Sequence, residues 1–71
     1  MDEATLGRVT AEWNELVGRI GRLIAFRRSE RFADLSDTAQ HDLAVQLVFM
    51  QGYRDVLGKR IERATGVWPR L

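Results

Sequence analysis

Apolar side chains recur at intervals of three and four residues over the first third of the chain. This spacing places them on one face of an α-helix and is typical of a helix that packs along its length against another. The pattern predicts a helix over residues 3–28, which Asp2 or Thr5 would cap. The positions that share the spacing are Leu6, Val9, Trp13, Leu16, Ile20 and Leu23.

A second apolar face of the same kind follows a break at residues 29–36. Ser36 is the expected N-cap, and Gly66 and Pro69 suit the end of a helix. The pattern predicts a helix over residues 37–65 and a short tail over 66–71. The whole chain, residues 1–71, is then a single all-α domain, a two-helix antiparallel hairpin. The apolar face of the predicted second helix comprises Leu43, Leu47, Met50, Leu57 and Ile61.

The predicted second helix carries another apolar stripe on its far side, at Val45, Phe49, Gly52 and Val56. At about 100° per residue this stripe lies opposite the first face, so one partner helix cannot cover both. A single core in a chain of 71 residues supplies only about 3–5 kcal/mol, and no cysteine is present to form a disulfide. We therefore expect the hairpin to assemble through this stripe into a homo-oligomeric helical bundle, from a dimer to a hexamer.

The composition of the chain indicates which classes of partner and cofactor are not expected. The formal net charge of +1 gives no strong positive field, so a nucleic-acid polymer is not an expected partner. The chain has no long apolar run that would span a membrane. One histidine and no cysteine predict no metal site and no cofactor. The acidic start, Met1-Asp2-Glu3, is unlike a signal peptide, and the lack of cysteine suits a reducing cytoplasm.

No catalytic signature is present in the sequence. It contains no glycine-rich phosphate loop, no zinc-ligand spacing and no nucleophile elbow. His41, beside Asp42 at the start of the second helix, is interpreted as a surface residue. We therefore do not expect an enzyme.

Aromatic residues offer the first candidates for ligand binding. Trp13 falls on the apolar face, where it is either a core side chain or a ring that stacks on a nucleobase, with Asn14 reading the base edge. Tyr53 flanks the second face together with Gln46, as a half-buried boundary pair or as the lining of a pocket. Trp68 in the tail either covers an apolar edge or is free for stacking.

Arginines are the second set of candidates for ligand binding. Arg27 and Arg28 belong to a cluster at the break, which is either solvated or binds phosphate near the start of the second helix. Arg54 falls on the second apolar face. It either extends to solvent or pairs with a glutamate, or it binds an anion at a subunit junction.

These residues resemble a family of small helical-hairpin proteins encoded by tailed and crAss-like phages. The resemblance covers about residues 6–62, and Gln46, Tyr53 and Arg60 are its least generic positions. It is carried by Arg8-Val9, Glu12, Leu16, Arg19-Ile20, Leu23 and Phe26, then by Phe32 and Leu35, and then by Leu43, Gln46-Leu47, Met50, Tyr53, Leu57 and Arg60-Ile61.

The chain is also similar to the helical-hairpin part of phage anti-CBASS and anti-Thoeris sponges. Those homo-oligomers sequester cyclic oligonucleotide or cyclic ADP-ribose signals between subunits, without cleaving them, and pack an aromatic ring and a basic side chain on a base. Trp13-Asn14 and Arg28 would be the matching elements here. The resemblance implies a phage anti-defence sponge in the host bacterial cytoplasm. Its predicted ligand-binding residues are Trp13, Asn14, Arg27, Arg28, Tyr53 and Arg54.

Two other functions stay open at this point. The hairpin could be a module that binds a host or phage protein through the stripe at residues 45–56, and a stoichiometric partner would then be recovered with it. It could also be an RNA-binding bundle that uses its arginines, in which case binding would weaken steeply with salt.

Overall fold

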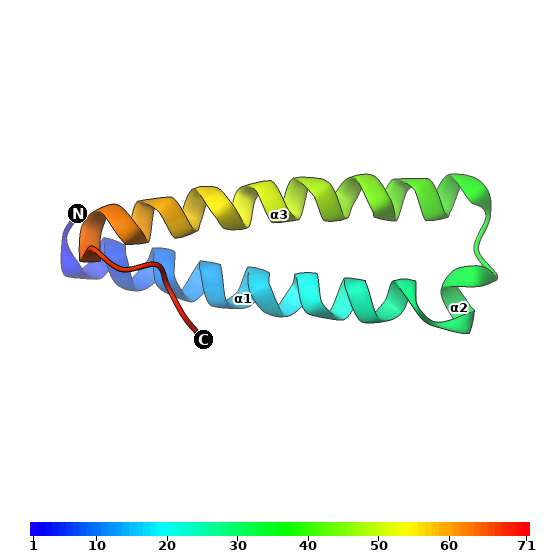
Figure 1. The fold of residues 1–71 in the computed structure, drawn as a ribbon, viewed down its shortest axis with the longest axis horizontal. Helices are drawn as coiled ribbons and strands as arrows, with labels where there is room; N and C mark the ends of the chain where they lie inside the picture. Colours follow the sequence, from blue (N-terminus) through cyan, green and yellow to red (C-terminus); the bar gives the residue numbers. More distant parts are fainter.

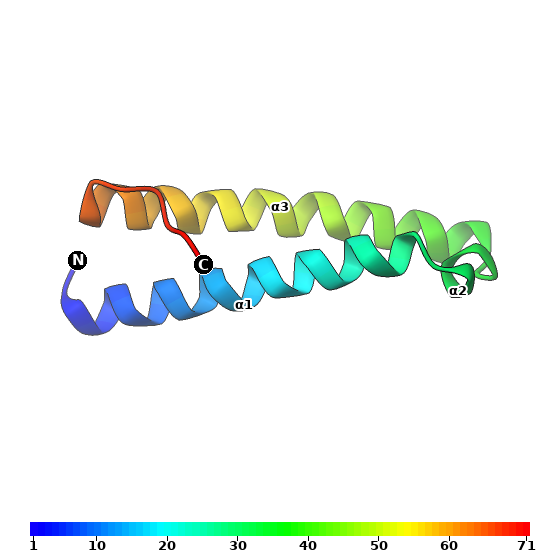
Figure 2. The ribbon, with the colours of Figure 1, turned by 60° about the horizontal axis from the view of Figure 1, so that its bottom comes forward.

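The computed structural model describes all residues, 1–71, and contains only helices. Their order is α1 (Glu3–Arg27), α2 (Glu30–Ala33) and α3 (Asp37–Thr65). The two long helices lie side by side and antiparallel, and α2 forms the corner at one end (Figure 1, Figure 2). The molecule is a rod of 46 × 17 × 17 Å. The all-α prediction is confirmed. None of the helices combines the length and the apolar character that crossing a membrane requires.

Polar caps fix where the long helices begin and end. The Asp2 carboxylate accepts the Thr5 N–H at 2.7 Å, so Asp2 is the cap of α1. This bond from the Thr5 backbone, with a further one from its side chain, lowers the pKa of Asp2. Ser36 Oγ accepts the Ala39 N–H at 3.1 Å and caps α3. Gly66 ends α3 with φ of +82°, in the left-handed region that favours glycine.

The predicted break between the long helices contains one helical turn, α2. Ser29 Oγ donates to the Phe26 carbonyl at 2.6 Å and accepts the Phe32 N–H at 3.3 Å, which ends α1 and starts α2 with one side chain. Gln40 Nε2 donates to the carbonyls of Phe32 and Leu35 at 3.2 and 3.1 Å. The corner is therefore bonded to the first turn of α3.

The core is a single row of apolar side chains between α1 and α3. Leu57 is fully buried, while Leu43 and Met50 of the predicted face are only half-buried. Full burial of such a side chain contributes about 1.5–3 kcal/mol. The buried residues are Val9, Trp13, Leu16, Ile20, Leu47, Leu57 and Ile61.

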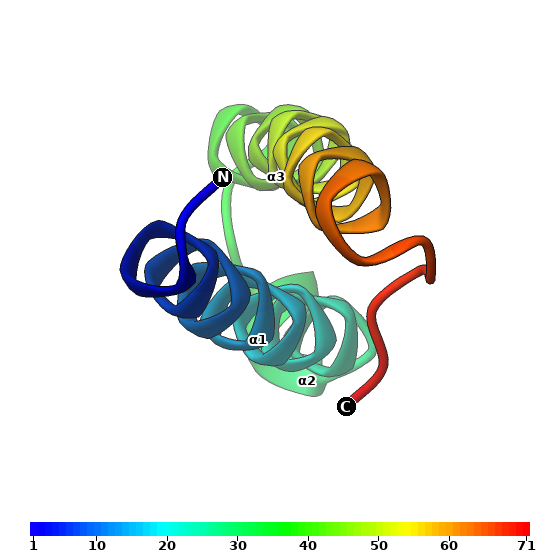
Figure 3. The same cartoon turned by 90° about the vertical axis from the view of Figure 1, so that its left-hand side faces the viewer.

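The C-terminal tail turns back from the end of α3 and passes toward α1 (Figure 3). Thr65 Oγ1 accepts the Val67 N–H at 3.2 Å, which helps to fix this turn. The Trp68 ring then lies against Gly58, where an added Cβ would come within 2.5 Å of Trp68 Cη2. Lys59 Nζ lies 5.9 Å from the centre of the same ring. Trp68 therefore covers a part of α3 that only glycine leaves free.

Gly58→Ala should displace Trp68 without unfolding the protein. The new methyl group takes the space of the ring, but alanine gains about 1 kcal/mol over glycine in a helix, which offsets the lost packing. Acrylamide quenching of Trp68 fluorescence, measured in a Trp13→Phe background, should therefore increase while the unfolding free energy changes by less than about 1 kcal/mol. Gly21→Ala, whose Cβ meets open space, is the matched control. Equal quenching in both variants would contradict this packing.

Candidate functional site

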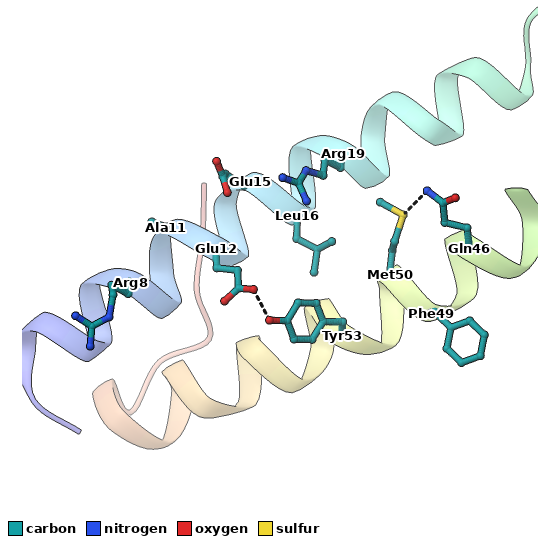
Figure 4. Close-up of a pocket in the computed structure, with 10 residues that line it drawn as sticks. All are labelled: Arg8, Ala11, Glu12, Glu15, Leu16, Arg19, Gln46, Phe49, Met50 and Tyr53. Carbon is teal, nitrogen blue, oxygen red and sulfur yellow. Dashed lines mark hydrogen bonds between the residues drawn. The ribbon is translucent and has the colours of Figure 1, made fainter.

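The largest hollow in the structure is an open groove between α1 and α3, with a volume of about 810 Å³ (Figure 4). It is far larger than the two other hollows, of about 280 Å³ each. Its α1 wall consists of Arg8, Ala11, Glu12, Glu15, Leu16 and Arg19, and its α3 wall of Gln46, Phe49, Met50 and Tyr53.

The α3 wall presents two aromatic rings and one amide. Phe49 and Tyr53 are 74% and 46% exposed, so their ring faces are accessible. The Gln46 amide nitrogen lies 3.7 Å from Met50 Sδ, and the side chain is exposed. Aromatic faces stack on bases, and an amide can donate to and accept from a base edge. This wall therefore suits a planar heterocycle.

The α1 wall presents charged groups of both signs. Arg8 Nη2 donates to Thr5 Oγ1 at 3.3 Å, and neither Arg8 nor Arg19 forms an ion pair. Their guanidinium groups are therefore available to an anion such as a phosphate. Glu12 and Glu15 carry equal and opposite charge, so the wall has no net charge and does not suit a long polyanion.

A hydrogen bond joins the two walls across the groove. The Tyr53 hydroxyl donates to the Glu12 carboxylate (Figure 4). This bond raises the pKa of Tyr53, since it stabilises the protonated phenol, and burial and the negative charge of Glu12 act in the same direction. Ligand entry between the walls would have to replace this bond.

Glu12→Gln should lower the pKa of Tyr53 toward its ordinary value of 10.0. The folded-state pKa of the wild type lies above that value, so the stabilising bond is present at lower pH and is lost as pH rises through the folded-state pKa. Tyr53 is the only tyrosine, so phenolate absorbance against pH reports it alone. Glu15→Gln, in the same wall but without a bond to Tyr53, should leave the curve unchanged. Identical curves for wild type and Glu12→Gln would contradict this contact.

Of the six residues predicted to bind ligand, only Tyr53 lines the groove. Trp13 is 6% exposed and belongs to the core, which favours the first of its two interpretations. No ring face of this side chain is free for stacking in this structure. Its Nε1 is buried without a hydrogen-bond partner. Asn14 is exposed and lies outside the groove.

The predicted arginines lie in two other places. Arg27 and Arg28 line a small hollow at the corner, together with Ile24 and Phe32. Arg27 Cζ lies 6.0 Å from the centre of the Phe32 ring. Arg54 pairs with Asp55 at 3.0 Å on the surface of α3. The structure therefore does not bring the six predicted residues into one site.

The α1 wall is the part of the groove that the sequence analysis missed. This wall contains two pairs of oppositely charged residues four positions apart. Because such pairs are typical of a solvated helix face, the sequence alone did not predict a binding wall here. One feature of the sequence could have predicted this wall: its charged residues lie directly beside the buried row of α1, on the side of the helix that faces α3. These residues are Arg8, Glu12, Glu15 and Arg19.

The stripe predicted as an oligomer interface is exposed in the single chain. Val45, Phe49 and Val56 are 39%, 74% and 56% exposed, and an added Cβ at Gly52 would meet nothing within 4 Å. The face is thus apolar and accessible, with open space at Gly52. Elsewhere, no three acidic or histidine side chains converge as metal ligands would.

Comparison with known proteins identifies one relationship. No curated protein and no solved structure matches the chain significantly. The model of a family called Sequestin, whose name suggests sequestration of a ligand, matches residues 3–63. The match includes α1, almost all of α3 and every residue of the groove. The chain therefore belongs to the Sequestin family.

Proposed function

We propose that this protein is a phage anti-defence sponge, a homo-oligomer that binds a cyclic nucleotide signal in the groove and holds it without cleaving it. The groove is the observation that carries the proposal. One wall offers the Tyr53 ring to a base, and the other offers Arg8 and Arg19 to phosphates. Membership of the Sequestin family supports sequestration of a ligand. The resemblance to anti-CBASS and anti-Thoeris hairpins favours a cyclic oligonucleotide or cyclic ADP-ribose signal.

The balance of charge in the groove favours a small ligand over a polymer. Two arginines and two glutamates line the groove, so its net charge is zero. The arginines can bind the few phosphates of a small ligand, whereas no strong positive field attracts a polyanion. The carboxylates of Glu12 and Glu15 can accept from ribose hydroxyls or exocyclic amines. An RNA polymer, by contrast, would need a continuous basic face that α1 does not have.

Calorimetric titration against cyclic di- and trinucleotides and cyclic ADP-ribose isomers tests the proposal. We expect one member to bind with Kd below about 10 µM, equivalent to about −7 kcal/mol. Tyr53→Ala should weaken binding at least tenfold, since it removes a stacking ring. Arg28→Ala, in the separate corner hollow, should leave binding unchanged. Ligand released by heating the complex should be recovered intact, because the protein does not cleave it. If no member of the panel binds, the proposal is refuted.

A second function is favoured by one observation, the exposure of Phe49 and Val56 on the outer face of α3. A partner protein could cover this face instead of a second copy. A pull-down would then recover a stoichiometric host or phage protein, and the isolated chain would be only a weak oligomer.

A further inference from the structure

We propose that α3 pairs antiparallel with α3 of a second copy, about a two-fold axis beside the Met50–Gln51 peptide bond. The pairing brings the two grooves onto one face of the dimer. This inference rests on the homo-oligomeric sponge proposed above and specifies how its subunits meet. It is carried by the exposed side chains of α3.

These exposed side chains form a regular row, here called the outer row. It lies opposite the buried Leu47, Leu57 and Ile61. Its central line, Val45, Phe49, Gly52 and Val56, has the four-, three- and four-residue spacing of a helix–helix contact. A contiguous apolar row on a monomer marks a binding surface. The outer row comprises Val45, Val48, Phe49, Gly52, Tyr53 and Val56.

The positions of the outer row are symmetric about its centre. Phe49 and Gly52 are equidistant from the Met50–Gln51 bond, and so are Val45 and Val56. In an antiparallel pair about a two-fold axis at that point, each residue faces its counterpart. The exposed Phe49 ring of each copy therefore enters the open space at Gly52 of the other. A large side chain opposite a small one is how packed helices interdigitate.

Charge favours the same arrangement. The axis places Asp42 of one copy level with Lys59 and Arg60 of the other, so opposite charges flank both ends of the outer row. All three side chains are exposed. A parallel pair in register would instead set Asp42 against Asp42. It would also set Phe49 against Phe49, and leave a gap where two Gly52 residues meet.

The antiparallel pairing has a consequence for the grooves. A two-fold axis that relates antiparallel helices is perpendicular to the plane that holds both, so it keeps each groove on the same face of the pair. Gln46, Phe49 and Tyr53 all lie on the flank of the outer row that the groove borders. The two grooves are therefore neighbours, and a bound ligand would meet side chains from both copies.

Disulfide trapping tests the pairing, because the chain has no native cysteine. Helices pack about 8–10 Å apart, and Cα atoms lie about 2.3 Å from the helix axis. Directly facing Cα atoms then lie about 3.4–5.4 Å apart, and the wider half of that range falls in the span of about 4.4–6.8 Å that a disulfide bridges. The doubly substituted chain Val45→Cys/Val56→Cys should give a closed covalent dimer when oxidised with oxidised glutathione.

The single variants are the controls. In the antiparallel pair, Val45 of one copy lies about 16 Å along the axis from Val45 of the other, so Val45→Cys alone stays monomeric on a non-reducing gel. Val56→Cys alone should behave in the same way. Efficient cross-linking of either single variant, a ladder of longer products, or an uncross-linked double variant would each overturn the pairing. Titration of the trapped dimer with the cyclic nucleotide panel keeps the proposals distinguishable, since a dimer that forms but binds nothing refutes only the sponge.

Discussion

Trp13→Ala should abolish the cooperative unfolding transition of the isolated chain. Trp13 is 6% exposed in a core of only seven buried apolar residues. Truncation of a buried aromatic side chain to alanine costs about 3–5 kcal/mol, which equals the whole of what one core supplies at this length, about 3–5 kcal/mol. Thermal melting followed by circular dichroism should show low initial helicity and no transition. A variant that melts cooperatively at the wild-type Tm would contradict this role.

Trp13→Phe is the matched control, since it keeps an aromatic side chain in the core. It also removes the buried Nε1–H, which has no hydrogen-bond partner. A buried unsatisfied donor costs about 1–3 kcal/mol, which offsets the loss of ring volume. This variant should therefore melt cooperatively and bind ligand with unchanged affinity. A folded Trp13→Phe protein that no longer binds ligand would show instead that the indole itself stacks on a base.

The fold could be predicted because periodicity and caps are local signals. The three- and four-residue spacing in α1 specified the face that is buried, and Ser36 and Gly66 marked the ends of α3. The helical turn α2 could not be predicted in the same way. It depends on Ser29 bonding in both directions and on Gln40, which reaches the corner from the next helix. Such contacts appear only when the chain has folded back on itself.

The candidate site was less predictable because its walls come from different helices. Tyr53 was recognised from its place beside the apolar face, and it lines the groove. Arg8 and Arg19 flank the apolar face of α1 in the same way that Tyr53 flanks the apolar face of α3. A charged residue in such a place is either solvated or part of a groove, depending on how the two helices are aligned. Arg54 illustrates the same difficulty, because its position on the apolar face did not reveal that it pairs with the neighbouring Asp55.

Phe49→Glu should dissociate the oligomer and leave a helical monomer. The side chain is 74% exposed in the single chain, so the substitution costs the monomer little. At the proposed interface, however, the carboxylate would lie in the apolar space beside Gly52 of the second copy without a cation. Burial of an unpaired charge costs several kcal/mol, and the two-fold symmetry applies that cost twice. Light scattering should report the monomer mass, and circular dichroism should report largely retained helicity.

Two further variants separate assembly from ligand contact. Ala4→Glu adds the same charge at an exposed position in the first turn of α1 and should keep the wild-type mass. Val56→Glu alters the outer row but not the groove, so it should dissociate the oligomer as Phe49→Glu does. If the two grooves form one composite site, Val56→Glu should also weaken ligand binding, although it removes no groove residue. A Phe49→Glu protein at the wild-type mass would show that the outer row is not the interface, because no packed helix pair accommodates two unpaired carboxylates at its centre.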